Sequence, residues 1–289
     1  MDHSFTTIVV TGSTDGLGRA VALELAAPGR RLILHGRDLE RGEEVRRGAV
    51  EKGAQAQFHR ADFASLAEVR ALAETIGREV DRVDLLINNA GIGFGPPLQR
   101  RQTSVDGLEL RLAVNYLAPY LLTELLRPLI LARPPSRVIN VASAGQHPID
   151  FSNLMLTEGY SGSRAYRQAK LAMIMWTMEL AAELGPQGVT VVSLHPAPFM
   201  NTTMVRQAWG VPMSSVAQGV AAVMNLVEMD IPPELNGAYF NGLSRASPHA
   251  QAQDVEVRRQ LVEMTRKLVG LDAEVGAVTR TWTPGSSSA

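Results

Sequence analysis

The stretch from residue 6 to residue 27 restricts the fold of this chain most strongly, because a β-branched run, a glycine-rich turn and an apolar helical pattern follow one another directly. The run 6–11 predicts a buried strand, and the pattern 19–27 predicts a helix. Between them stand Gly12, Gly16 and Gly18. Glycines let the backbone approach a phosphate closely, and a helix N-terminus offers unpaired N–H groups and the positive end of a dipole. The order predicts a phosphate-binding loop, although the Gly-x-x-x-Gly-x-Gly spacing alone would be weak evidence.

Apolar runs and helical patterns continue to alternate along the chain. We expect strands at 31–36, 56–60, 81–87, 136–142, 189–194 and 237–241, and helices at 39–52, 65–80, 106–131, 164–184, 215–228 and 254–269. Such alternation favours right-handed βαβ units. We therefore predict an α/β fold with a doubly wound parallel seven-stranded sheet. The prediction places one Rossmann-fold domain at residues 1–275, with a small helical lid near 199–214, and a flexible tail at 276–289.

Composition and charge exclude several other kinds of protein. The net charge is −1 and the arginines are scattered, so no basic patch is available for nucleic acid. There is no cysteine, and the six histidines show no ligand-like spacing, so we expect no metal site. The apolar region 116–132 is interrupted by Glu124, Arg127 and Pro128, which indicates a buried helix. Since we find neither a signal peptide nor a membrane anchor, we expect a cytoplasmic protein.

The end of the second predicted strand bears on which dinucleotide the glycine loop would bind. A fold that prefers NAD usually places a carboxylate there for the ribose hydroxyls. Here Gly36 and Arg37 occupy that place, and a guanidinium suits the 2′-phosphate of NADP. An arginine at this position can also simply lie in solvent, and Asp38 leaves NAD open. We predict NADP(H), with NAD(H) as the alternative.

A tyrosine and a lysine stand four residues apart in the helix predicted at 164–184. This spacing places Tyr166 and Lys170 on one helical face, one turn apart. An ammonium beside a phenol favours the phenolate, so we expect the pKa of Tyr166 to be lowered. Such a phenol can donate a proton to a carbonyl oxygen or take one from an alcohol. The alternative is a surface lysine beside a half-buried tyrosine.

Three further features concern the same region. Pro119 cannot donate to the carbonyl of Asn115, so the helix 106–131 should kink there and leave that carbonyl to water or a side chain. Ser143 follows the fifth strand, although a serine there could belong to a simple turn. Flexible methionines suit a lid over an apolar ligand, but packing explains them equally well. The apolar residues of the predicted lid are Met200, Met204, Trp209, Val211 and Met213.

Taken jointly, these residues resemble the short-chain dehydrogenase/reductase family, over roughly residues 6–201. The stretch 149–151 and the surroundings of Tyr166 are similar to its retinol-dehydrogenase and protochlorophyllide-reductase-like branch. The motifs occur in the order of the family, and together they are a strong signal that none provides alone. They are Thr11-Gly12-x-x-x-Gly16-x-Gly18, Asp62, Asn88-Asn89-Ala90-Gly91, Asn115, Ser143, Tyr166-x-x-x-Lys170 and His195-Pro196.

The resemblance implies hydride transfer between a nicotinamide cofactor and a carbonyl or secondary alcohol. It implies that Tyr166 is the general acid/base, that Ser143 hydrogen-bonds the substrate oxygen, that Lys170 binds the nicotinamide ribose and that Asn115 holds a water. Asp62 would contact the adenine. The expected cofactor-binding residues are Gly12, Ser13, Thr14, Asp15, Gly16, Leu17, Gly18, Arg37, Asp62, Phe63, Asn89, Ala90, Gly91, Tyr166, Lys170, Pro196 and Phe199.

The sequence departs from the family pattern after the sixth strand. Ala197 stands where a glycine is usual, and Asn201 stands where a threonine is expected, with Thr202 and Thr203 adjacent. This loop contacts the nicotinamide carboxamide in the family, so these substitutions bear on the geometry of that contact. Ala142 and Ala169 replace serines near the catalytic positions without removing a group that the mechanism needs.

We therefore expect an NADP(H)-dependent carbonyl reductase whose small-molecule substrate is an apolar ketone. The alternative is an NADP-binding regulatory or scaffold protein without turnover; a nucleic-acid-binding module lacks the basic patch it would need. The helix 164–184 is hydrophobic nearly all round, which predicts burial, in part against a second subunit of a homodimer or homotetramer.

Overall fold

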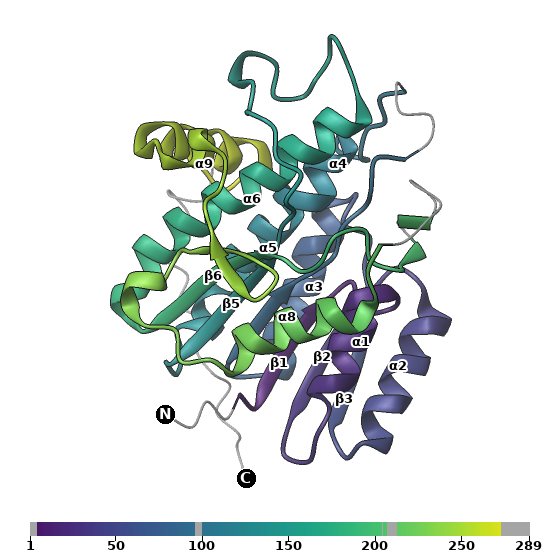
Figure 1. The fold of residues 1–289 in the computed structure, drawn as a ribbon. Coiled ribbons are helices and arrows are strands. Elements are labelled where there is room, and N and C mark those ends of the chain that lie inside the picture. The colour runs from purple at the N-terminus through teal and green to yellow at the C-terminus, as the bar shows by residue number, and fades with distance from the viewer. Residues whose placement is uncertain (1–4, 96–99, 204, 207–212, 273–289) are drawn as a thin grey trace.

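The structure, a computed structural model, describes residues 5–95, 100–203, 205–206 and 213–272 and shows a sheet covered by helices on both faces (Figure 1). Within these residues the sheet has eight strands in the order β3-β2-β1-β4-β5-β6-β7-β8. Its strands are β1 (Thr7–Thr11), β2 (Arg31–Gly36), β3 (Gln55–Arg60), β4 (Leu85–Asn88), β5 (Ser136–Val141), β6 (Val189–His195), β7 (Tyr239–Asn241) and β8 (Ser244–Ala246).

The helices form the two outer layers. One face of the sheet packs against α1 (Gly16–Leu25), α2 (Leu39–Glu51) and α8 (Val216–Glu228). The other packs against α3 (Leu66–Glu79), α5 (Ala118–Ile130) and α6 (Gly162–Leu184), with α9 (Val255–Val269) lying on α6. A short α4 (Leu110–Leu112) and a π-helical turn (Ala113–Leu117) precede α5. No helix in the described part of the chain has both the length and the apolarity to cross a bilayer.

Side-chain caps explain where the helices begin. An aspartate or serine precedes α1, α2, α3, α6, α8 and α9, and its side chain accepts a hydrogen bond from the first turn of the helix. Such a cap satisfies one of the N–H groups that have no partner within the helix. The capping residues are Asp15, Asp38, Ser65, Ser161, Ser215 and Asp254.

The strand order reverses between β1 and β4, and this reversal positions the site. The chain winds from β1 outward to β3 and then returns to place β4 on the other side of β1, in parallel register with Val9 opposite Leu86. Helices after β1 and β4 therefore lie on opposite faces, which opens a crevice at the carboxyl ends of these strands. The glycine loop after β1 and the Asn89–Gly91 segment after β4 both lie at that edge.

The predicted α/β fold with a doubly wound parallel sheet is confirmed, but three details were wrong. An eighth strand, β8, pairs antiparallel with β7; three residues after a turn at Gly242 are too few for a recognisable pattern. The fourth strand begins at Leu85 and not at residue 81; the carboxylate of the preceding Asp84 accepts from the backbone N–H groups of Thr6 and Thr7. The helix predicted at 106–131 is not continuous but contains the π-helical turn. The tail predicted at 276–289 lies outside the described residues.

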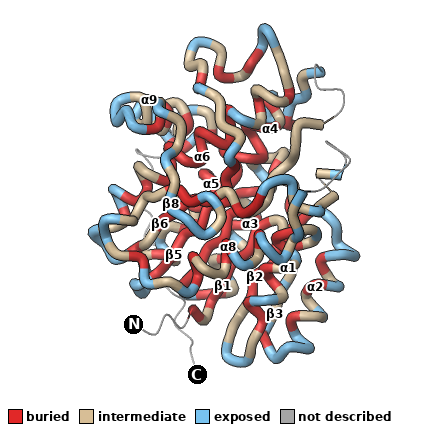
Figure 2. The backbone as a smooth tube through the Cα atoms, in the orientation of Figure 1, coloured by how far each residue is buried: buried red, intermediate tan, exposed pale blue. Residues whose placement is uncertain are grey.

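The long helix α6 is buried by elements of its own chain. Figure 2 shows buried backbone running through the central strands and α6, while α2 is largely exposed on its outer side. Met173, Ile174 and Trp176 of α6 are at most 1% exposed. The apolar residues around this helix therefore pack on the sheet, on α5 and on α9.

A buried arginine gives a first prediction, on stability. Arg137 of β5 is 2% exposed, and its Nη1 donates to the carbonyls of Leu226, Val227 and Met229 at the end of α8. Arg137→Leu would leave these carbonyls without that donor, so we expect the free energy of unfolding to fall by about 2 kcal/mol in urea denaturation. The control is Arg133→Leu, whose side chain is 66% exposed, with an expected change within about 0.5 kcal/mol. Equal effects would contradict the prediction.

Candidate active site

Tyr166 and Lys170 lie on one side of α6, as the four-residue spacing predicted. The ammonium Nζ of Lys170 is 5.9 Å from the centre of the Tyr166 ring. It donates a 2.8 Å hydrogen bond to the carbonyl of Val141, the last residue of β5. Lys170 is 5% exposed, so the alternative of a surface lysine is wrong. The helix and the end of β5 are thereby joined at one point.

Ser143 lies just beyond β5 and faces Tyr166. Its side chain hydrogen-bonds with the Tyr166 hydroxyl, and its Oγ accepts from the Gly145 N–H at 3.1 Å. Ser143 is 8% exposed. The structure therefore brings together the serine, tyrosine and lysine that lie far apart in the sequence, because the carboxyl end of β5 packs against the first turns of α6.

Asn115 occupies the middle of the π-helical turn. Pro119 follows at the second position of α5, so the helix is interrupted where the proline predicted, with a π-helical turn as the form of the interruption. The Asn115 side chain is fully buried; its Oδ1 accepts from the N–H of Ile92 at 2.7 Å and its Nδ2 donates to the Ile92 carbonyl at 3.0 Å. This amide therefore holds the chain after β4 in place.

Gly91 is where Asn115 and Lys170 meet. A Cβ added to Gly91 would lie 3.1 Å from Asn115 Oδ1 and 3.7 Å from Lys170 Nζ. Three predicted site residues, from the segment after β4, the π-helical turn and α6, thus lie close together. A side chain at position 91 would fill the space between them.

The electrostatics of the pair differ from the sequence prediction. Burial raises the pKa of Tyr166, against a smaller lowering by the Ser143 hydrogen bond. Burial lowers the pKa of Lys170 to about 8. The expectation that Lys170 lowers the pKa of Tyr166 is wrong for this structure, because the ammonium points to the Val141 carbonyl and the phenolate would lose hydration. The tyrosine is therefore held as a neutral phenol that can donate a proton.

The glycine loop is packed so closely that side chains are excluded. Gly12 and Gly16 have φ angles of 66° and 51°, which glycine adopts readily. A Cβ on Gly18 would lie 2.2 Å from the Gly12 carbonyl oxygen. The Asn89 side chain donates to the carbonyls of Thr11 and Gly12 at 2.9 and 3.1 Å, which ties the loop to the end of β4. The loop is a rigid cradle at the N-terminus of α1, which fits a dinucleotide pyrophosphate.

Two predicted cofactor residues point away from the loop surface. The Ser13 side chain is fully buried and exchanges hydrogen bonds with the backbone of His35. Leu17 is a residue of α1, and its side chain is buried in the core cluster. Since these side chains are committed to the interior, Ser13 and Leu17 can meet a phosphate through their backbone N–H groups only. Thr14 packs against Gly36, where a Cβ would lie 2.3 Å from the threonine Cγ2.

Asp15 stabilises the N-terminus of α1, where the glycine loop ends. It caps α1 by accepting from the Gly16 N–H at 2.7 Å, and its carboxylate lies 3.6 Å from Arg41 Nη1. Hydrogen bonds from Thr203 and Gly16, with the charges of Arg41 and Arg206, outweigh burial and lower its pKa. The negative charge beside the loop is thus balanced by arginines.

The ends of β2 and β3 present Arg37 and Asp62. The Arg37 side chain is 63% exposed and its Nη1 lies 3.8 Å from Asp62 Oδ2. Asp62 Oδ1 accepts from the Ala64 N–H at 2.9 Å. Asp38 caps α2 by accepting from the Arg41 N–H. The Phe63 ring is buried and stacked on His35, so a cofactor contact at this residue would come from its backbone.

The predicted lid is described only at its two ends. Pro196 is buried directly after β6, whereas Phe199 is 38% exposed with a φ of 40°. The ends join through backbone hydrogen bonds from Met213 to Phe199 and from Asn201 to Ser214. Ala197 is not among the described residues with positive φ, so the alanine is accommodated without left-handed backbone. Met204, Trp209 and Val211 lie outside the described residues.

Two residues at the site were missed in the sequence. The Phe94 ring meets the Tyr166 ring edge-on, with centres 4.8 Å apart and planes at 88°. Its carbonyl accepts from the buried Arg111 at 2.5 Å. His35 lies under the glycine loop, where its Nδ1 accepts from the Gly12 N–H at 3.3 Å; burial lowers its pKa to about 4. Phe94 stands in a Gly- and Pro-rich loop without periodicity, so no sequence signal marks it; a histidine in an apolar strand beside a glycine turn could have marked His35.

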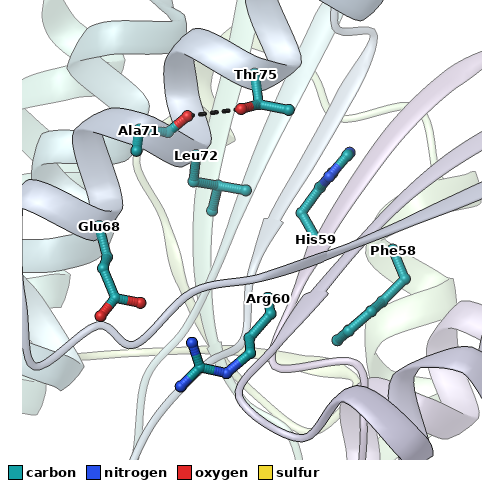
Figure 3. Close-up of a pocket in the computed structure, with 7 residues that line it drawn as sticks. All are labelled: Phe58, His59, Arg60, Glu68, Ala71, Leu72 and Thr75. Carbon is teal, nitrogen blue, oxygen red and sulfur yellow. Dashed lines mark hydrogen bonds between the residues drawn. The ribbon is translucent and has the colours of Figure 1, made fainter.

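A separate hollow lies between β3 and α3 and does not belong to this site. It has a volume of about 220 Å³ and is open to solvent, and Figure 3 shows its lining. None of the predicted site residues contributes to it. The lining residues are Phe58, His59, Arg60, Glu68, Ala71, Leu72 and Thr75.

Comparisons with known proteins agree with this geometry. Residues 6–210 match the family model for short chain dehydrogenases. The chain is 36% identical to retinol dehydrogenase 13 of Homo sapiens, over 92% of this chain and 85% of the relative. Among solved structures, an uncharacterised protein of Mycobacterium paratuberculosis is 27% identical with a TM-score of 0.75, covering 92% of this chain and 93% of that chain.

A second solved structure has a bound dinucleotide. It is a metagenomic short-chain oxidoreductase in complex with NADP, 28% identical with a TM-score of 0.62, and the match covers 78% of this chain and 91% of that chain. The fold and the site agree with these similarities. The sheet is doubly wound, the glycine loop lies where the strand order reverses, and the tyrosine–lysine pair lies beside a serine. The chain belongs to the short-chain dehydrogenase family, in its retinol-dehydrogenase-like branch, and is an oxidoreductase that acts on CH–OH or C=O groups with NAD(P).

Proposed function

We propose that this protein is an NADP(H)-dependent carbonyl reductase in which Tyr166 is the general acid/base. The observation that carries the proposal is the buried hydrogen bond between the Tyr166 hydroxyl and Ser143, with Lys170 one helical turn away. A carbonyl oxygen placed between the two hydroxyl groups would accept a hydrogen bond from each. Ser143 orients the oxygen, and Tyr166 delivers the proton as the oxygen becomes an alkoxide.

The glycine cradle fits the cofactor by its shape and by its donors. Because Gly12, Gly16 and Gly18 carry no side chain, the loop backbone can approach a pyrophosphate, whose charge the N-terminus of α1 would favour. When bound, NADP(H) supplies or accepts the hydride. Lys170 would bind the nicotinamide ribose, and Asn115 keeps the Gly91 segment in place beside it.

The protonation states favour reduction. Because burial raises the pKa of Tyr166, the phenol keeps its proton at neutral pH and is ready to act as an acid. Lys170, with a pKa near 8, is mostly an ammonium there and can return a proton towards the site after turnover. Two observations support NADP(H) over NAD(H). The Arg37 side chain is exposed at the end of β2, where it could pair with a 2′-phosphate, and the Asp38 carboxylate caps α2, so it is already engaged there and not with ribose hydroxyls.

The substrate we propose is an apolar ketone or aldehyde. Phe94 contributes an aromatic surface beside Tyr166, and Phe199 is partly exposed at the start of the lid segment. The names of the retinol dehydrogenase relatives point to an apolar alcohol or carbonyl as well. Small polar sugars or hydroxy acids as the sole substrates would contradict this proposal.

The test of the reaction is NADPH oxidation by the purified protein with a panel of apolar ketones. Turnover that requires both NADPH and a ketone is expected. The alternative from another class, an NADP-binding regulatory or scaffold protein, predicts binding of NADPH without oxidation for every ketone. The location in the cytoplasm and assembly into a homodimer or homotetramer stay predictions.

Arg37 provides a prediction on cofactor preference. Arg37→Ala removes the guanidinium proposed to pair with the 2′-phosphate, so kcat/KM for NADPH should fall about 50-fold, whereas that for NADH should change less than about threefold. Arg46→Ala is the matched control. Arg46 lies in α2, which follows Arg37 in the chain, and its Nε pairs with Glu43 at 2.6 Å, so its loss should leave both kcat/KM values unchanged. Equal losses with both cofactors would refute the role of Arg37.

A further inference from the structure

The C-terminal part of the chain holds the loop that follows β5. Tyr239 of β7 is 4% exposed, and its hydroxyl donates a 3.2 Å hydrogen bond to the backbone carbonyl of Ser143. β7 is fixed in the sheet, with Tyr239 opposite Ser193 of β6. This contact joins residues 96 positions apart in the sequence, and Tyr239 lies beyond residues 6–210 matched by the family model.

Two glutamines extend the same attachment. Gln146 Nε2 lies 3.4 Å from the Ser143 carbonyl, and its Oε1 accepts from the His249 N–H at 2.7 Å. Gln251 binds both backbone groups of Ile149, accepting at 2.6 Å and donating at 3.0 Å. The loop from Ser143 to Ile149 is thus held along its length by residues from β7 to the turn at Ala250–Gln253.

Packing alone does not require a hydroxyl at position 239, whereas the hydrogen bond to the Ser143 carbonyl does. The ring belongs to the core beside α6, where a phenylalanine would bury the same apolar surface. A buried hydroxyl requires a partner, and this one bonds to the carbonyl of the serine that meets Tyr166 and to the side chain of Gln146, which contacts the same carbonyl. Burial raises the pKa of Tyr239 to about 12, so the hydroxyl remains a donor throughout the neutral range.

We propose that Tyr239 is a positioning residue, which aims the Ser143 hydroxyl at the substrate oxygen by fixing the peptide plane that follows Ser143. A hydrogen bond to the carbonyl restricts rotation of that peptide, and therefore of the Cα–Cβ direction of the serine. Ser143 can then present its Oγ to Tyr166 at a constant distance. This inference rests on the proposed role of Ser143 in ketone reduction.

The first experiment measures kcat, KM and NADPH affinity for Tyr239→Phe, which removes only the hydroxyl. We expect kcat for the reduction of an apolar ketone to fall about tenfold, with the Kd of NADPH unchanged within about twofold. Tyr120→Phe is the matched control: Tyr120 is equally buried and its hydroxyl bonds to Arg266 away from the site, so kcat should keep its wild-type value.

The second experiment asks whether Tyr239 acts through Ser143. In a Ser143→Ala background, single-turnover rates should change less than about twofold when Tyr239→Phe is added, because the group being positioned is already gone. A wild-type kcat for Tyr239→Phe, an equal loss in both backgrounds, or a loss matched by weaker NADPH binding would overturn the inference. An inert wild-type protein, or full activity of Ser143→Ala, would instead refute the proposed function.

Discussion

Replacing Tyr166 by phenylalanine is expected to lower kcat for ketone reduction about 1000-fold while NADPH still binds. The substitution keeps the ring that Phe94 contacts edge-on and removes the hydroxyl that hydrogen-bonds with Ser143. Without this acid, the oxygen would have to take its proton from water in a buried site. Single-turnover oxidation of bound NADPH and a titration of NADPH binding measure the two effects separately.

The control for this substitution is again Tyr120→Phe, which removes a buried hydroxyl outside the site and should leave kcat unchanged. The role of Tyr166 as the general acid would be untenable if Tyr166→Phe kept more than about a tenth of the wild-type kcat. Loss of NADPH binding together with kcat would point to a disturbed helix α6 instead.

The second large effect is expected at the glycine cradle. A Cβ on Gly18 would lie 2.2 Å from the Gly12 carbonyl and 2.3 Å from the Asn89 amide nitrogen, so Gly18→Ala must displace the backbone of the loop itself. We expect NADPH binding to weaken about 50-fold and the free energy of unfolding to fall by about 2 kcal/mol. Isothermal titration with NADPH and urea denaturation measure these changes.

Gly77→Ala is the matched control for the cradle. Gly77 lies inside α3, and a Cβ there would meet nothing within 4 Å. The alanine should raise the free energy of unfolding by about 0.5–1 kcal/mol, since it removes backbone freedom from the unfolded chain, and NADPH binding should not change. Unaltered NADPH affinity in Gly18→Ala would show that the cradle tolerates displacement, contrary to its proposed role.

These expectations share one structural cause, the meeting of several strand ends at one edge of the sheet. The glycine loop follows β1, Gly91 follows β4 and Ser143 follows β5, and α6 delivers Tyr166 and Lys170 to the same edge. The order of the strands places these segments side by side because parallel strands end together. A change that moves one segment is therefore expected to affect both binding and turnover.

Local patterns were sufficient for the layout of the fold. β-branched runs and glycine turns at the ends of strands marked the parallel sheet, and the spacing of Tyr166 and Lys170 defined one face of a helix. Pro119 marked the interruption at Asn115, because a missing N–H acts on the residue four positions before it whatever surrounds the helix. The strand β8 was missed, since its three residues are too few to show an alternating pattern.

The residue pattern was enough to predict the doubly wound sheet, the glycine loop and the residues that meet at its edge. The surroundings of these residues could not be predicted in this way: Lys170 donates to the Val141 carbonyl, burial raises the pKa of Tyr166, and Tyr239 donates to Ser143. The physical reason is that strand and helix patterns arise from neighbours a few residues apart. Burial, pKa values and long-range hydrogen bonds depend on groups that the fold alone brings into contact.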